Sequence, residues 1–283
     1  MAGIFSGLKQ MGLGDLEDSD LYGEEKTAEP VKAAAPKLML PEEKELIYDK
    51  TFTCPVCDQK FTSRIVKSGK ARALPIELDL RPRHEGIDTI KYDVVMCPDC
   101  GYAAISRYFD SMTASQNRMI QEKISGKVKM KKYTEDYYTY EEAIGRYKMA
   151  LVCAMVKKAK NSEKAYICLK SAWLMRGYRE DLEKKGRLTP EKQKELTEQE
   201  TEYLQNAYKG FVDAQQSESY PICGMDEHTM DYLTAALAYE VDELDMASRC
   251  VARLLVSTAN TRIKDKAREL KDMIMAKRKE TGK

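Results

Sequence analysis

The sequence lacks a long hydrophobic run. No stretch approaches the ~18 consecutive apolar residues that a membrane-spanning helix needs. Residues 1–9 (MAGIFSGLK) also lack the basic start and the long apolar centre of a secretory signal peptide. We therefore expect a soluble protein that stays in the cytoplasm and has no membrane span.

An excess of charge of one sign is also missing. The 283 residues include 47 basic and 46 acidic side chains, which gives a formal net charge of +1. Such a balance creates no overall field that would attract nucleic acid or an anionic membrane. Nucleic-acid binding would have to rely on a local cluster such as the lysines between residues 123 and 132, and it is the alternative rather than the first interpretation.

No catalytic constellation is recognisable. Of the two histidines, His84 lies in a polar turn and His228 follows Cys223 by five positions. A cysteine and a histidine can act as nucleophile and base, but no third residue that would orient His228 is identifiable. Asp226, close to His228, is a residue that the start of a helix also attracts. We therefore do not expect an enzyme.

The sequence does contain eight cysteines, and four of them form two Cys-x-x-Cys units, at residues 53–57 (TCPVC) and 97–101 (CPDCG). In a reducing compartment such units hold a metal ion more often than a disulfide. Two intervening residues let a tight turn direct both sulfurs at one ion, and proline and glycine suit that turn. The predicted metal ligands are Cys54, Cys57, Cys97 and Cys100.

Four thiolates predict a structural zinc site. They complete a tetrahedron around Zn²⁺ and leave no position for water or substrate. A module of about fifty residues gains too little from apolar burial to fold alone, whereas structural zinc contributes ~10–16 kcal/mol in small peptides. Iron is the alternative metal, because similar Cys-x-x-Cys turns in rubredoxins hold iron for electron transfer. An electron carrier would not need the long remainder of the chain, so we predict one zinc ion per chain.

The pattern of apolar residues changes along the chain from strand-like to helical. Short strands are predicted at residues 60–66, 73–80 and 92–96. Asp79, Arg81 and Arg83 alternate along the segment between the two cysteine pairs. Such spacing could build an anion-binding surface, but exposed strand charges or a structural Asp–Arg pair are the favoured interpretation. Farther along the chain, Thr113 and Gln116 predict a capping box at the start of a helix.

From Tyr140 onward, apolar stripes predict six helices in antiparallel pairs. Small residues such as Ala150 and Ala165 let paired helices approach closely, as in tetratricopeptide repeats, although any helical bundle also needs small residues at its crossings. The remaining cysteines in these stripes are expected to be core residues: Cys153, Cys168 and Cys250.

We predict an α+β fold, mainly α, in three parts. Residues 1–44 are a flexible tail with a short amphipathic segment, residues 45–130 a β-rich, four-cysteine zinc module with a following helix, and residues 135–283 an α-helical, tetratricopeptide-like domain. The tail places apolar residues at nearly helical spacing among glycines, so it would order only on a partner. Its candidate partner-binding residues are Ile4, Leu8 and Met11.

Four segments together resemble an uncharacterised bacterial family, domain of unknown function 2225, found mainly in Gram-positive bacteria. These segments are FTCPVC with the following Phe61, LDLRP at residues 78–82, VMCPDCGYA at residues 95–103 and YICLKSAW at residues 166–173. The resemblance covers most of the chain from Phe52 onward. It implies a zinc-ribbon-like module in the N-terminal part and tetratricopeptide-like helices in the C-terminal part, and it brings no established activity.

The predicted function is binding. Helical hairpins would offer a groove to a protein or peptide partner, while the metal fixes the shape of the front module. The protein would then be an adaptor or scaffold. A nucleic-acid-binding zinc module and an iron electron carrier are the alternatives.

Overall fold

The computed structural model describes residues 41–128 and 135–281. Within them, three small antiparallel sheets of two strands each precede the long helices. Strand β1 (Ile47–Thr53) pairs with β2 (Lys60–Val66), β3 (Ala73–Leu74) with β4 (Arg83–His84), and β5 (Val94–Met96) with β6 (Ala103–Ile105). The candidate tail residues Ile4, Leu8 and Met11 lie outside the described residues.

The strand predictions succeed only in part. The strand at residues 60–66 is confirmed, whereas only Ala73–Leu74 and Val94–Met96 of the other two predicted segments are strands. Leu80 has a φ of 66°, a left-handed conformation that interrupts the alternation of a strand. Strand β1 was not predicted because most of its side chains are exposed, so it lacks an alternating apolar pattern.

Seven α-helices follow in the described part of the chain, and they confirm a fold that is α+β and mainly α. Helix α1 precedes the second region, and the six helices predicted from Tyr140 onward are all present. Their bounds are α1 Ala114–Lys123, α2 Tyr140–Val156, α3 Asn161–Lys184, α4 Pro190–Ser217, α5 Glu227–Glu240, α6 Leu244–Val256 and α7 Thr261–Thr281. The capping box of Thr113 and Gln116 at the start of α1 is confirmed.

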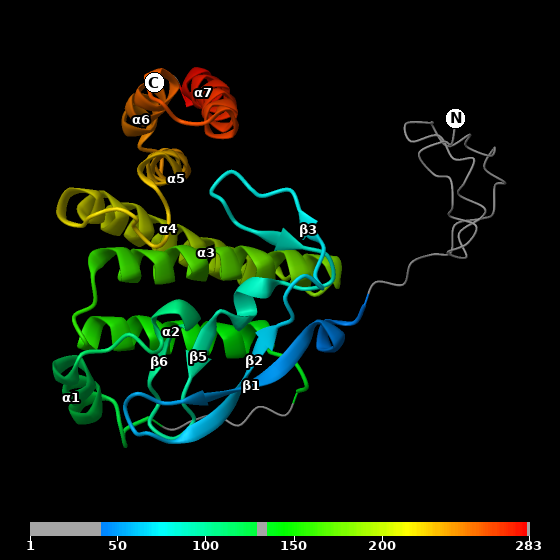
Figure 1. The fold of residues 1–283 in the computed structure, drawn as a ribbon. Coiled ribbons are helices and arrows are strands. Elements are labelled where there is room, and N and C mark those ends of the chain that lie inside the picture. The colour runs from blue at the N-terminus through cyan, green and yellow to red at the C-terminus, as the bar shows by residue number, and fades with distance from the viewer. Residues whose placement is uncertain (1–40, 129–134, 282–283) are drawn as a thin grey trace, which may run out of the picture. The chain divides into compact units, whose positions relative to one another are not determined.

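The helices pack mainly against their neighbours in sequence. Helix α3 contacts α2 on one side and α4 on the other, and α5, α6 and α7 continue the series (Figure 1). Strands β5 and β6 contact α2, as Figure 1 also shows. At the α3–α4 crossing, a Cβ atom on Gly210 would lie 2.9 Å from the Cβ of Ala165, so a glycine is needed there. No helix in the described part of the chain is long and apolar enough to cross a membrane.

Two large apolar cores hold these elements together. The larger core joins the cysteines of the two Cys-x-x-Cys units, strands β5 and β6, and helices α1 to α5. Its buried members include Val95, Tyr147 and Leu169. The second core lies among α5, α6 and α7. Cys153 and Cys168 are buried in the first core and Cys250 in the second, as predicted. The domain boundary near residues 130–135 stays a prediction.

A buried polar cluster ties the LDLRP segment to helix α3. The carboxylate of Asp79 is fully buried, where it accepts a hydrogen bond from the indole N–H of Trp173 (2.9 Å) and pairs with the guanidinium of Arg176 (3.1 Å). Arg81 is also buried and donates two hydrogen bonds to the carboxylate of Glu180. Asp79 and Arg81 are thus structural, and they bind the long connection between the two Cys-x-x-Cys units to the helices.

This burial predicts a large effect for Asp79→Asn. Removing the charge leaves the half-buried guanidinium of Arg176 without its fully buried partner, and we expect a loss of roughly 3 kcal/mol in the free energy of unfolding. Urea denaturation followed by circular dichroism measures it. The control is Asp265→Asn, which removes an exposed ion pair with Arg268 and should cost less than about 1 kcal/mol. Equal, small losses in both variants would contradict the structural role of Asp79.

Candidate metal centre and helical groove

Each Cys-x-x-Cys unit lies in the turn that joins two antiparallel strands. The first connects β1 to β2, and its turn closes with the N–H of Cys54 donating to the carbonyl of Gln59 (2.9 Å). The second connects β5 to β6 and closes with the N–H of Cys97 donating to the carbonyl of Tyr102 (2.8 Å). Both pairs of cysteines are therefore presented by the same local geometry.

The residue after each pair has a left-handed backbone conformation. Asp58 has a φ of 58° and Gly101 a φ of 76°. Glycine adopts this conformation without steric cost, and aspartate tolerates it better than most residues. A Cβ atom at Gly101 would also lie 3.0 Å from the side chain of Val128, so glycine is required there for space as well. The predicted role of glycine in the second turn is confirmed.

The two turns bring the four cysteines together. Their sulfur atoms all lie within 4.8 Å of one another, with 3.5 Å between the sulfurs of Cys54 and Cys100 and 3.7 Å between those of Cys57 and Cys97. Zinc–sulfur bonds of about 2.3 Å in a tetrahedron require sulfurs about 3.8 Å apart. A disulfide would need about 2.05 Å. The cluster could therefore hold one metal ion.

The crowded thiols favour a bound cation. Hydrogen bonds from the thiols of Cys100 and Cys54 lower the pKa of Cys97 well below its usual value. For Cys100, the hydrogen bonds with Cys54 and Cys97 act together with burial to raise the pKa. Neighbouring thiolates repel one another, so the four groups can ionise together only around a positive charge. Their arrangement thus matches a metal centre better than a set of independent thiols.

Helix α1 covers the first turn. The side-chain amide of Asn117 donates to the carbonyl of Pro55, and that of Gln121 donates to the carbonyl of Val56 at 2.9 Å. Cys54, Cys97 and Cys100 are buried, while Cys57 is half-buried. This cover was not predictable from the sequence, because amide side chains at helical spacing also suit a solvated surface. A closed, largely buried set of four sulfurs offers no room for a substrate.

The histidines do not belong to this cluster. His228 forms a hydrogen bond with Thr258 (3.3 Å), while the thiol of Cys223 donates to the carbonyl of Ser162. No hydrogen bond joins His228 and Cys223 within the described residues, and Asp226 caps helix α5 by accepting from the N–H of Thr229. His84 is hydrogen-bonded to Thr89 (3.3 Å).

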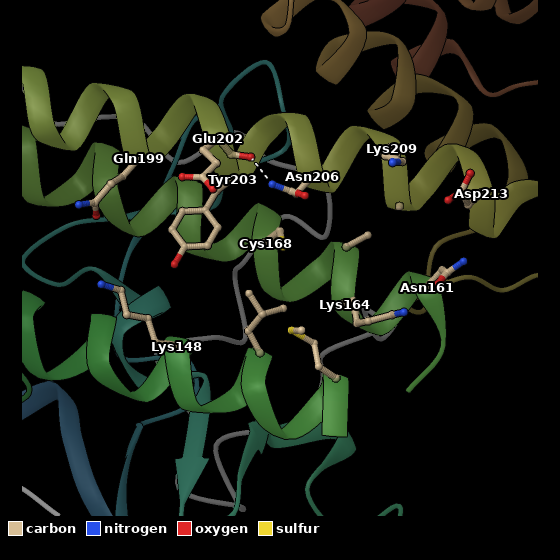
Figure 2. Close-up of a pocket in the computed structure, with 14 residues that line it drawn as sticks. Lys148, Asn161, Lys164, Cys168, Gln199, Glu202, Tyr203, Asn206, Lys209 and Asp213 are labelled. Carbon is tan, nitrogen blue, oxygen red and sulfur yellow. Dashed lines mark hydrogen bonds between the residues drawn. The ribbon is translucent and has the colours of Figure 1, made fainter. Parts of the chain in front are cut away.

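A second candidate site is a groove between helices α2 and α4, with α3 as its floor (Figure 2). Its volume is 610 Å³. Leu151 and Met155 of α2 line one wall, and Tyr203 of α4 lines the other. Met155 is 63% exposed although it is apolar. A groove on the helical hairpins was expected, but the residues that line it were not predictable, because its walls come from segments about fifty residues apart.

Comparison with known proteins identifies the family of the chain. A search of the curated proteins found no match, and neither did a search of the solved structures. A family model described as an uncharacterised protein conserved in bacteria (DUF2225) matches residues 47–274, which include all four cysteines of the two Cys-x-x-Cys units and most of the helices. The chain therefore belongs to this bacterial family.

Proposed function

We propose that the chain is an adaptor, in which one zinc ion fixes the front module and the helical groove binds a segment of a partner protein. The observation that carries the proposal is the groove over α3, where apolar side chains such as Met155 are open to solvent. Exposed apolar side chains in a concave surface are typical of protein–protein contact.

A second hollow extends the binding surface. It lies between α4 and α6, has a volume of 610 Å³ and is lined by Gln215 of α4, Thr234 of α5 and Met246 of α6. The first hollow lies between α2 and α4 over α3, so the two hollows flank α4. Each hollow is lined by three consecutive helices, and this repetition supports a tetratricopeptide-like arrangement, which would present an extended surface to one partner.

Zinc suits the metal centre because the site is closed. Four cysteine sulfurs fill a tetrahedron, and burial of three of them leaves the ion a structural role. In this proposal the ion fixes the two turns and the strands that they join. Iron in the same four thiolates would instead make an electron carrier, and electron transfer would not require the groove between the helices.

The metal proposal predicts about one zinc ion per chain in freshly purified protein. Elemental analysis measures it, and we expect Cys97→Ala to lose the ion because three thiolates leave the tetrahedron open. Cys250→Ala is the matched control, since Cys250 is buried among α5, α6 and α7 and should keep the ion. Iron in place of zinc, or zinc retained equally by both variants, would contradict the proposal.

The groove proposal predicts that a charge in the groove blocks the partner. The tagged full-length chain would be used to recover partners from the native organism, with mass spectrometry to quantify them. Met155→Asp should reduce recovery by about tenfold, because a carboxylate disrupts the apolar contact. Met273→Asp, on the exposed side of α7, is the control and should leave recovery unchanged. Equal recovery with both variants would contradict the groove as the site, and recovery of nucleic acid instead of protein would favour the nucleic-acid alternative.

A further inference from the structure

The groove between α2 and α4 carries a distinct set of positive charges. Lys148 of α2, Lys164 of α3 and Lys209 of α4 all line it. Figure 2 shows Lys148 at one end of the groove, and Lys164 on α3 and Lys209 on α4 toward the other end, where Asp213 also lies. Within the described residues, none of the three forms an ion pair. Many other charged residues of the chain are paired, so these three lysines remain available to a ligand.

Depth distinguishes one of these lysines from the acidic residues nearby, because Lys164 is half-buried whereas Lys148 and Lys209 are exposed. Glu202 and Asp213 also line the groove, but both are on α4 and exposed. Lys164 is half-buried on α3, the helix that forms the floor. A side chain of the partner that reaches the floor therefore meets an ammonium group, whereas the two carboxylates remain in contact with water. An incoming carboxylate is favoured there and an incoming ammonium group is repelled.

The neutral polar residues of the groove reinforce this preference. The amide group of Asn161 lies toward the end that holds Lys164, and that of Asn206 lies near the middle of the groove, where it donates to the carbonyl of Glu202 (Figure 2). Amide N–H groups can donate to the oxygens of a carboxylate that lysine ammonium groups neutralise. Leu151 and Met155 on the α2 wall are apolar, so a partner segment also needs an apolar residue to cover them.

We infer that the groove recognises an acidic segment of a protein partner, with a carboxylate side chain directed at Lys164 and Lys209 and a neighbouring apolar side chain on Leu151 and Met155. This inference rests on the proposed function, because it identifies the chemistry of the partner at the same groove. It excludes a basic segment, which would place an ammonium group against Lys164.

An unbiased peptide library tests the inference with the full-length chain. Random peptides of about twelve residues would be displayed and selected for binding to the wild-type protein, because about twelve extended residues exceed the length of such a groove. Selected peptides would then be synthesised, and their affinities measured by fluorescence anisotropy. We expect the selection to enrich aspartate or glutamate beside apolar residues.

Two double variants locate the binding. Lys164→Glu with Lys209→Glu should weaken the selected peptides by about tenfold or more, because it reverses two charges at the site. Lys184→Glu with Lys194→Glu is the matched control, since it reverses two exposed lysines on the same helices α3 and α4 away from the groove. Circular dichroism checks that both variants fold. If the Lys164→Glu, Lys209→Glu variant does not fold, the milder Lys164→Gln, Lys209→Gln variant replaces it in the binding measurement.

The outcomes separate the inference from the proposed function. Acidic peptides that lose affinity only in the groove variant support the inference. Neutral or basic peptides that depend on the groove, as shown by the loss of their affinity in Met155→Asp, would overturn it and leave the adaptor function in place. A selection that yields no peptide dependent on the groove would contradict both.

Discussion

The packing of the second Cys-x-x-Cys turn against helix α2 is the contact on which the rest of the structure depends. The backbone N–H of Ala103 donates to the sulfur of Cys153 at 3.4 Å, and the thiol of Cys153 lies 3.9 Å from the carbonyl of Gly101. Both Gly101 and Ala103 closely follow Cys100, and Cys153 and Ala103 are buried. So short a hairpin is not stable alone, and in the proposed function the metal ion would hold its two cysteines in this position.

The consequence for function follows from the geometry of α2. Residues two positions apart lie on nearly opposite sides of a helix, so Cys153 faces the second Cys-x-x-Cys turn while Leu151 and Met155 face the groove. The same helix therefore connects the metal centre with the proposed binding surface. The proposed zinc ion has no part in chemistry in this account. It stabilises the turn against which one wall of the groove is packed.

The sequence predicted what depends on local spacing. The four-cysteine cluster was predictable because two residues between each pair fix the turn, and helices α2 to α7 were predictable from their apolar stripes. The role of Asp79 was left open between an exposed charge and a structural pair, because only the docking of its segment on α3 decides its burial. Lys164 and Lys209 carried no signal either, since they line one groove only after α3 and α4 pack side by side.

Hydrogen exchange with and without a strong zinc chelator tests this account most directly. Removal of the metal from the full-length chain should speed amide exchange in the two turns and in α2 together, while α6 and α7, which pack in the second core, keep their protection. The result that would contradict the account is loss of the metal, verified by elemental analysis, with amide exchange throughout α2 unchanged.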